Sequence, residues 1–444
     1  MCSFLFSTKS FGQHSIESIN KLLKPRGPDY TSHVEINKYS FLHNLLSITG
    51  PVSPQPFTDK DIAVLYNGEI YNYKQFGNYE SDGQCLIDLY KEHGKSFVKL
   101  LDGEFAICLI DFAQQKLIIS TDIFKTKPIF FGFDDGQFGC STYSTPLQQL
   151  GYKQIKKATP NTLYEFDLTN FKCLSQEKIY EFSLNQHKLD YEDWVESFNQ
   201  SIKKRTIDLN KNLFIGLSSG YDSGLIYLKL IEQNKPFTCL SLFGTENSDI
   251  IHERLSMYPW DTSNIIKLEK NQTDFNFSKL QVKSKTEPFL YPIQSDDGYK
   301  ESNMWLVNDQ GSINFATLCR HAKKQKCKVV LSGTGADEII SDYGLKGKKF
   351  FPHSNFGGVF PKDLSKIFPW SSFYGSTLES YIAKEEYVGG SFGIEVRYPF
   401  LDKNVIQEYL WLSQDLKNSS YKAPLEYIFS QTNFPYEKEN KRGF

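Results

Sequence analysis

Two short features of this sequence combine residue types and spacing that can do chemistry. Cys2 follows Met1, whose removal would leave a thiol beside a free α-amine. That amine has an unperturbed pKa of roughly 8 and can serve as the base for the thiol. The second feature is the string LSSGYDSG at 217–224, which lies between an apolar run and a helical pattern. A thiol nucleophile and an anion-binding turn in one chain predict two separate chemical steps.

The turn in this string is typical of a phosphate site. A strand that ends in a Gly/Ser turn and continues into a helix presents backbone amides to an anion at the helix start. Ser218, Ser219 and Ser223 add hydroxyl donors, and Gly220 permits a close backbone approach. Asp222 would repel phosphate, so it predicts Mg²⁺ between the two. The string lacks GxxxxGK[ST] and is not a Walker loop; an ordinary Ser/Gly turn is the alternative for this string taken alone.

A second string, LSGTGADE at 331–338, repeats the pattern. An apolar β-branched run leads into a turn of small residues, which is followed by the carboxylates of Asp337 and Glu338. Parallel sheets bind ligands outside the C-terminal ends of their strands. One carboxylate from each string at that edge predicts a metal–pyrophosphate site.

The chain is predicted to contain two domains. Residues 1–180 are rich in short apolar or alternating runs broken by Gly, Asp and Asn, which predict a mainly β, antiparallel, layered domain with a few helices. A polar segment at 176–192 is the expected linker. Residues 190–444 alternate helical patterns with short apolar strands such as LFIGL, which predict a parallel sheet covered on both faces.

Composition excludes several classes of protein. The net charge is −2, from 50 basic and 52 acidic residues, so no basic excess indicates a nucleic-acid partner. No apolar run approaches the roughly 20 residues of a membrane helix, and the N-terminus does not resemble a signal peptide. The eight cysteines form no CxxC pair, so all except Cys2 are expected to be buried, reduced thiols of a cytoplasmic protein.

The string NGEIYN at 67–72 is open to two interpretations. The side-chain amide of Asn67 and the backbone N–H of Gly68 could stabilise the oxyanion that forms when a thiol attacks an amide. Asn-Gly is also the commonest hairpin turn, and the residues alone favour that hairpin.

Taken together, the motifs resemble those of the asparagine synthetase family. SSGYDS resembles its SGGxDS loop, LSGTGADE its LSGEGADE, GIEVRYPFLD at 393–402 its GVEARxPFLD, and the terminal KRGF its KxGF. NGEIYN, RGPDY at 26–30 and SDG at 81–83 resemble its class II glutamine amidotransferase domain. The resemblance implies an N-terminal α+β, Ntn-hydrolase-like αββα domain. It also implies a C-terminal α/β parallel-sheet PP-loop domain of the adenine nucleotide α-hydrolase-like kind.

For the N-terminal domain, the resemblance implies a glutaminase. Cys2 would attack the side-chain amide of glutamine, with Asn67 and Gly68 as the oxyanion hole. Glu69 and Asp82 would hold the α-amine of glutamine. The liberated ammonia would pass through an internal channel to the second site.

For the C-terminal domain, the resemblance implies ATP-dependent activation of a carboxylate. Lys422, which otherwise reads as a solvated surface residue, would steady the charge of the adenylation transition state. Asp222 and Asp337 would hold Mg²⁺. The nucleotide would be bound at Leu217 and Phe243 (adenine), at Ser218, Ser219, Gly220, Asp222 and Ser223 (pyrophosphate), and at Ser332 and Gly333 (ribose and acyl group).

Two positions depart from the family pattern. Leu45, in HNLLS, stands where the family has an arginine that pairs with the α-carboxylate of glutamine. Losing that contact should cost on the order of 1.5–3 kcal/mol, or roughly tenfold to a hundredfold in binding, unless Asn44, His43 or Arg26 compensates. Thr334 stands where the family has a glutamate near the acyl and amine partners.

These observations predict a glutamine- and ATP-dependent amidotransferase that converts a carboxylate to an amide and releases AMP and pyrophosphate. The acceptor is aspartate or another small carboxylate, such as a sugar uronate. One alternative is an adenylating ligase or cyclase with an impaired glutaminase, as in β-lactam synthetase-like enzymes; another is a non-catalytic nucleotide-binding module. The family resemblance also favours a homodimer.

Overall fold

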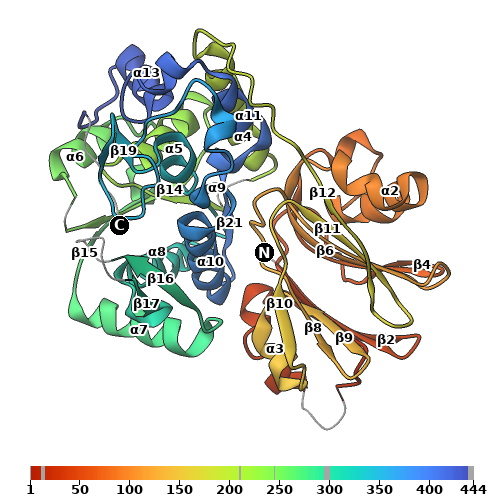
Figure 1. Cartoon of the computed structure of the whole chain (residues 1–444). Helices are drawn as coiled ribbons and strands as arrows, with labels where there is room; N and C mark the ends of the chain where they lie inside the picture. The colour runs from red at the N-terminus through yellow and green to blue at the C-terminus, as the bar shows by residue number, and fades with distance from the viewer. Residues whose placement is uncertain (1, 12–15, 210–211, 245, 295–300, 439–444) are drawn as a thin grey trace. The chain divides into compact units, whose positions relative to one another are not determined.

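The computed structural model describes residues 2–11, 16–209, 212–244, 246–294 and 301–438 (Figure 1). The terminal KRGF motif therefore lies outside the described residues. The chain folds into two compact units, each of which is described by itself. Unit 1 comprises Met1–Glu181, Lys285–Pro288 and Glu386–Glu395, and unit 2 comprises Phe182–Ser284, Phe289–Glu385 and Val396–Phe444.

Unit 1 is built on two six-stranded antiparallel sheets. The first has the order β10-β8-β9-β1-β3-β2 and the second the order β12-β11-β7-β6-β5-β4. The first contains β1 (Ser3–Ser7), β2 (Tyr30–Ile36), β3 (Tyr39–Leu45), β8 (Phe130–Asp134), β9 (Gln137–Ser141) and β10 (Gln154–Lys157). The second contains β4 (Phe57–Asp59), β5 (Ile62–Ile70), β6 (Gly103–Asp111), β7 (Lys116–Thr121), β11 (Thr162–Asp167) and β12 (Cys173–Lys178).

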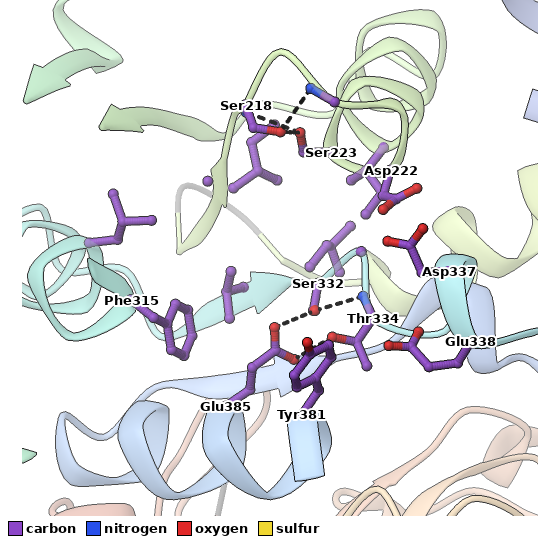
Figure 2. A pocket seen from close by; sticks show the side chains of 18 of the residues that line it. Ser218, Asp222, Ser223, Phe315, Ser332, Thr334, Asp337, Glu338, Tyr381 and Glu385 are labelled. Atoms are coloured by element: carbon purple, nitrogen blue, oxygen red, sulfur yellow. Dashed lines mark hydrogen bonds between the residues drawn. The ribbon is translucent and has the colours of Figure 1, made fainter. Parts of the chain in front are cut away.

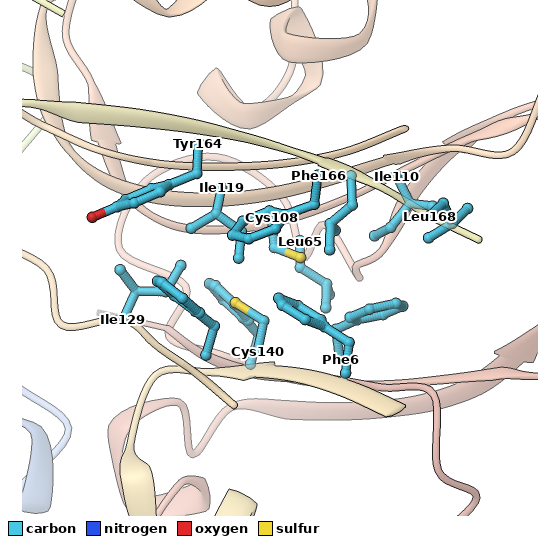
Figure 3. Packing of buried hydrophobic residues seen from close by; sticks show 14 of the residues in the cluster. Phe6, Leu65, Cys108, Ile110, Ile119, Ile129, Cys140, Tyr164, Phe166 and Leu168 are labelled. Atoms are coloured by element: carbon cyan, nitrogen blue, oxygen red, sulfur yellow. The ribbon is translucent and has the colours of Figure 1, made fainter. Parts of the chain in front are cut away.

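The main core of unit 1 lies between these two sheets (Figure 3). Successive side chains of a strand point to opposite faces, so Phe4 and Phe6 of β1 meet Leu65 of β5 and Cys108 of β6. A second cluster joins the other face of β5 and β6 to α2 (Cys85–His93). On the first sheet, α3 (Ser144–Gln149) packs against β8 and β9, and α1 (Ile16–Asn20) against α3. The predicted antiparallel, layered first domain is confirmed.

Unit 2 is built on a five-stranded sheet of order β15-β14-β13-β18-β21. β13 pairs in parallel with β14 and β18, and β14 with β15, which confirms the predicted parallel sheet. The strands are β13 (Leu213–Gly216), β14 (Thr238–Phe243), β15 (Ile265–Glu269), β18 (Val329–Leu331) and β21 (Glu395–Arg397). Two hairpins accompany them: β16 (Leu290–Gln294) with β17 (Glu301–Trp305), and β19 (Gly344–Leu345) with β20 (Lys348–Lys349).

Helices pack around this sheet. α5 packs against β13 on one side and against α4 and α13 as well, whereas α8 packs against β14. The amphipathic pattern predicted from residue 193 is α4, and the apolar run after the Ser/Gly turn is α5. The helices are α4 (Glu192–Arg205), α5 (Tyr221–Glu232), α6 (Ser248–Ser256), α7 (Gln272–Lys285), α8 (Gln310–Lys324), α9 (Ser371–Tyr374), α10 (Ser376–Ser391), α11 (Lys403–Trp411), α12 (Gln414–Lys417) and α13 (Ala423–Thr432).

The topology explains why the two carboxylate-bearing turns meet. β13 and β18 are parallel neighbours, so the turns that follow them emerge at the same edge of the sheet. The first turn leads into α5, and the second leads into a short π-helical segment, Ala336–Ser341.

Two predictions from composition can be compared with the structure. Six of the cysteines are buried as expected, but Cys173 is exposed because it begins the edge strand β12. All eight are free thiols. In the described part of the chain, no helix has both the length and the apolar character needed to cross a bilayer.

Candidate active sites

In unit 2, the Ser/Gly turn after β13 is held by its own hydroxyls. Ser218 Oγ and Ser223 Oγ lie 2.8 Å apart, and the backbone N–H of Gly220 donates to Ser218 Oγ at 3.1 Å (Figure 2). Helix α5 then begins at Tyr221 without a side-chain cap. The first amides of a helix have no acceptor within the helix, so the turn and the helix start together form an anion-binding geometry.

The two predicted metal-binding carboxylates come together beside this turn. Figure 2 shows the carboxyl groups of Asp222 and Asp337 pointing toward one another. The ammonium of Lys422 lies 2.5 Å from Asp222 Oδ1 and 2.8 Å from Asp337 Oδ1. Close approach of the two turns requires Gly333, because a Cβ there would lie 2.7 Å from the Cβ of Asp222. A cation is thus held between carboxylates from two different turns.

Lys422 has a strained backbone as well as a buried side chain. It adopts φ 51° at the N-cap of α13, in the left-handed region that costs a non-glycine residue on the order of 1 kcal/mol. The neighbouring hydroxyl of Tyr421 donates to Asp337 Oδ1 at 2.7 Å. Two adjacent residues are therefore aimed at one carboxylate.

A pocket opens at these turns, and it contains most of the predicted nucleotide site. Its walls come from β13, the turn after it, α5, α8, β18, the turn after β18, and α10. Predicted residues in its lining are Ser218, Gly220, Asp222, Ser223, Ser332, Gly333 and Asp337.

Three predicted nucleotide residues lie outside that lining. Ser219 is bound to Glu246: its N–H and its hydroxyl donate to Glu246 Oε2 at 2.8 and 2.5 Å. Leu217 is buried, with its N–H donating to Leu240 O at 2.8 Å. Phe243 lies at the end of β14, with its ring 5.6 Å from that of His252.

The pocket also contains a carboxylate that the motifs did not indicate. Glu385 of α10 accepts hydrogen bonds from Ser332 Oγ at 2.8 Å and Thr334 Oγ1 at 3.2 Å (Figure 2). Loss of hydration raises the pKa of Glu385 to about 7, the two hydroxyls oppose that rise, and the charge of Glu338 adds to it. A carboxyl group that titrates near neutral pH inside a pocket is a candidate general base.

Glu338, also in the lining, is held rigidly. Its carboxylate accepts from the backbone N–H of Gly335 at 2.8 Å and from the hydroxyl of Tyr343. Burial, with the charge of Asp337, raises the pKa of Glu338.

In unit 1, the hairpin interpretation of NGEIYN is wrong. Asn67 and Gly68 lie inside β5, where they pair with Ala106 and Phe105 of β6. Gly68 adopts φ 140°, and a Cβ there would lie 1.9 Å from the carbonyl oxygen of Glu104. The position therefore requires glycine because of the close approach of β6.

The side-chain amide of Asn67 has unused hydrogen-bonding capacity. It is fully buried, and neither its Nδ2 nor its Oδ1 has a hydrogen-bond partner among the described residues. A buried amide without partners is costly, so this group fits a ligand oxygen. Phe4 of β1 and Leu65 of β5 both belong to the core between the sheets. Cys2 is two residues before Phe4, and Asn67 is two residues after Leu65. Because side chains alternate along a strand, Cys2 and Asn67 continue the positions that face this core.

The thiol of Cys2 is half-buried and needs a base. Loss of hydration raises its pKa to about 11, a positive N-terminus opposes the rise, and the charge of Asp82 adds to it. A thiol with this pKa is protonated at neutral pH, so its nucleophilicity depends on proton transfer to a nearby group.

Asp82, predicted to hold an α-amine, is fixed beside β5. Its Oδ2 accepts from the hydroxyl of Tyr66 at 2.6 Å and from the N–H of Ile70 at 2.8 Å, and its Oδ1 from the N–H of Gly83 at 2.9 Å. Burial raises its pKa. Glu69 lies on the same strand, next to Gly68.

Leu45, which stands where the family has an arginine, is the last residue of β3. β3 pairs Asn44 with Ser3, and the same antiparallel register extended by one residue sets Leu45 opposite Cys2. None of the three residues considered as substitutes can supply a cation. Arg26 is fully buried in an ion pair with Glu386, with Nη2 2.8 Å from Oε2.

The other two substitutes are neutral. The amide of Asn44 is bound to Ser3 and Asn20. Burial and the nearby N-terminal charge lower the pKa of His43 to about 3, so its ring is uncharged at neutral pH.

Comparison with known proteins agrees with the two-part organisation. Residues 1–189 match the glutamine amidotransferase domain family, and residues 194–361 match the asparagine synthase family. The chain is 26% identical to a putative asparagine synthetase [glutamine-hydrolyzing] of Methanocaldococcus jannaschii over 91% of its length and 73% of the relative's. Asparagine synthetases of Sandersonia aurantiaca and Arabidopsis thaliana are each 24% identical over 90% of this chain, and the matches cover 75% and 68% of their lengths.

Proposed function

Because this chain belongs to the asparagine synthetase family, with a glutamine amidotransferase domain followed by an asparagine synthase domain, we propose that it makes an amide from a carboxylate. The nitrogen would come from glutamine, and ATP would be cleaved to AMP and pyrophosphate. Residues 1–180 would act as the glutaminase and residues 190–444 as the synthetase. The acceptor would be aspartate or another small carboxylate.

The observation that carries this proposal is the meeting of Asp222, Asp337 and Lys422. An ammonium 2.5 and 2.8 Å from two carboxylates needs residues from three separate segments. An ordinary Ser/Gly turn does not require such a meeting. The meeting of these three side chains supports a site that binds a polyanion together with its counter-cation.

The carboxylates also fit the metal that the chemistry needs. Mg²⁺ is usually held by one or two carboxylates together with substrate phosphates, so Asp222 and Asp337 would hold it. The described residues contain no group of three or more Asp, Glu, His or Cys side chains that could hold a metal ion by themselves. The ion would neutralise charge on the departing pyrophosphate.

The residues of the chain have separate tasks in the activation step. Ser218, Ser223 and the amides at the start of α5 would bind the pyrophosphate part of ATP. Lys422 would stabilise charge on the phosphoryl group as the acceptor carboxylate attacks it. Glu385 would take the proton from the incoming amine, since its pKa of about 7 matches that task.

In unit 1, the α-amine left at Cys2 would take the proton from the thiol, which then attacks the amide carbon of glutamine. The unpartnered amide of Asn67 and the N–H of Gly68 would bind the oxyanion. Glu69 and Asp82 would bind the α-amine. Cleavage of the C–N bond, with the proton returned from the α-amine to the nitrogen, would release ammonia and leave a thioester, whose hydrolysis would release glutamate.

The test is a pair of assays on protein with Met1 removed. One measures glutamate release from glutamine, and the other measures pyrophosphate release from Mg-ATP with aspartate and a panel of other carboxylates. The proposal predicts that Cys2→Ala abolishes glutamate release but keeps pyrophosphate release when ammonia is supplied. Absence of pyrophosphate release by the wild type with every carboxylate would contradict it.

One observation favours a second candidate function, an adenylating ligase with an impaired glutaminase. Leu45 stands opposite Cys2, and the residues considered as substitutes offer no cation for an α-carboxylate. In such an enzyme an amine of the substrate itself would attack the adenylate. Formation of an amide product together with AMP, with neither ammonia nor glutamine supplied, would support this second candidate.

A further inference from the structure

Beneath the Ser/Gly turn lies a buried cation that the sequence motifs did not indicate. Arg254 of α6 is fully buried, and its Nη1 donates to the carbonyl oxygens of Ser218 at 2.7 Å and Gly220 at 2.8 Å. Its Nε donates to Pro435 O at 2.9 Å, and its guanidinium lies 4.8 Å from the centre of the Phe434 ring. The side chain therefore ties the turn to α6 and to the segment after α13.

These two hydrogen bonds fix the direction of the next two amides. A peptide unit is planar and trans, so the N–H of one residue points opposite to the carbonyl of the residue before it. The carbonyl of Ser218 points toward Arg254, so the N–H of Ser219 points away from it. The carbonyl of Gly220 does the same, so the N–H of Tyr221, the first residue of α5, also points away from Arg254.

The outward N–H of Ser219 already binds an anionic group. It donates to Glu246 Oε2 at 2.8 Å. The orientation imposed by Arg254 thus produces an amide N–H that donates to a carboxylate oxygen, as it would to a phosphate oxygen.

The guanidinium has the charge and the surroundings of a group placed for an anion. Burial lowers its pKa to about 10, which leaves it protonated at neutral pH, and the charge of Glu246 opposes that decrease. Its Nη2 is buried and has no hydrogen-bond partner among the described residues. A buried, incompletely bonded cation destabilises a fold, so stability alone does not account for Arg254.

The start of α5 is shaped to admit this cation. A Cβ at Gly224 would lie 2.8 Å from Cζ and Nη1 of Arg254 and 2.9 Å from its Nη2. Any side chain at residue 224 would displace the guanidinium from beneath the turn.

We propose that Arg254 is the positioning residue of the pyrophosphate-binding turn: it holds the carbonyls of Ser218 and Gly220 toward itself, so that the N–H groups of Ser219 and Tyr221 point away from it, and it adds a fixed positive charge behind them. It does not touch the reacting atoms. This inference rests on the proposed ATP-cleaving function of the same site.

The experiment measures the KM for ATP and the inhibition constant of added inorganic pyrophosphate in the pyrophosphate-release assay, for the full chain and its variants. Arg254→Lys can hold only part of the fork of hydrogen bonds, so we expect both constants to rise about tenfold to a hundredfold. Gly224→Ala leaves Arg254 in the chain but displaces it, and should raise both constants too. In Arg254→Ala, added methylguanidinium should lower the KM for ATP.

The matched control is Arg205 of α4, another buried arginine, which binds Asp402 at 2.8 Å and lies outside the pocket lining. Arg205→Lys should lower the unfolding temperature without changing the KM for ATP. If Arg254→Lys and Gly224→Ala keep the wild-type KM and pyrophosphate inhibition, the positioning role is refuted while the proposed function stands. If the wild type releases no pyrophosphate and binds no ATP, the proposed function itself fails, and the inference with it.

Discussion

Thr334 Oγ1 donates a hydrogen bond to Glu385 Oε2 over 3.2 Å. The turn that has threonine where the family has glutamate is thus in contact with a carboxylate supplied by a helix about fifty residues later in the chain. Loss of hydration raises the pKa of that carboxyl group to about 7. The pocket therefore has a titratable acid beside the second turn. That acid comes from α10, and not from the position in the turn where the family has glutamate.

The first prediction concerns the pH profile of Glu385→Gln. A group that acts as a base must be deprotonated, so the rate of the wild type should rise through about pH 7. The amide side chain keeps the shape but cannot accept the proton, so we expect a loss of about 10²- to 10⁴-fold at pH 8 and no rise near pH 7. Ammonia-dependent amide formation, measured from pH 5.5 to 9 at saturating ammonia, checks this. A profile with an unchanged rise would assign the base elsewhere.

The same carboxyl group should make stability depend on pH. Its pKa is higher in the folded chain than the ordinary value of 4.5, so its stabilising contribution is complete below about pH 4.5 and is lost as pH rises through about 7. Glu385→Gln should therefore gain stability relative to the wild type between those values, by on the order of 1–3 kcal/mol at pH 8. Urea unfolding at pH 4.5 and pH 8 measures this; equal differences at both pH values would contradict it.

Restoring a cation opposite Cys2 should improve glutamine binding. Leu45→Arg can supply the bidentate contact to the α-carboxylate, and we expect the KM for glutamine to fall roughly tenfold to a hundredfold. The measurement is glutamate release as a function of glutamine concentration. Leu45→Met is the matched control, because it keeps an apolar chain without charge. A folded Leu45→Arg protein with unchanged KM would show that the carboxylate binds elsewhere.

Glu246 should compete with ATP for the turn. Its carboxylate accepts the N–H and the hydroxyl of Ser219, donors that the pyrophosphate would otherwise use. A charged acceptor binds about twice as strongly as a neutral one, so Glu246→Gln should lower the KM for ATP by roughly threefold to tenfold. Glu253→Gln, at an exposed position on α6, the helix that follows Glu246, should leave the KM for ATP unchanged. A KM that rises in Glu246→Gln would mean that this carboxylate supports the turn instead.

Much of the synthetase site could be predicted from sequence because its signals are local. The apolar runs of β13 and β18 and the small-residue turns after them are each readable within about ten residues. Parallel pairing then brings Asp222 and Asp337 to one edge of the sheet. Lys422 has no such local signal, and only the family motif indicated it.

The residues that sequence reasoning missed act through long-range contacts. Glu385 has only a weak local signal, as one of two adjacent acidic residues in the partly apolar run YIAKEEYVGG. Arg254 and Glu246 reach the turn from beyond the next strand, and nothing in their own neighbourhood marks them. Asn67 was ambiguous because Asn-Gly favours a hairpin locally, whereas nine residue pairs with β6 keep this segment extended.

The most direct test of the account is pyrophosphate release from Mg-ATP, with ammonia and each carboxylate of the panel, by the wild type and by Asp222→Asn. Removing one of the two carboxylates that meet at Lys422 should abolish metal–pyrophosphate binding while glutamate release from glutamine stays unchanged. The account predicts that the wild type releases pyrophosphate only with one acceptor of the panel. It predicts that Asp222→Asn releases pyrophosphate at least about a hundredfold more slowly with that acceptor. Release that is equal in the two proteins, or absent from the wild type with every carboxylate, would contradict it.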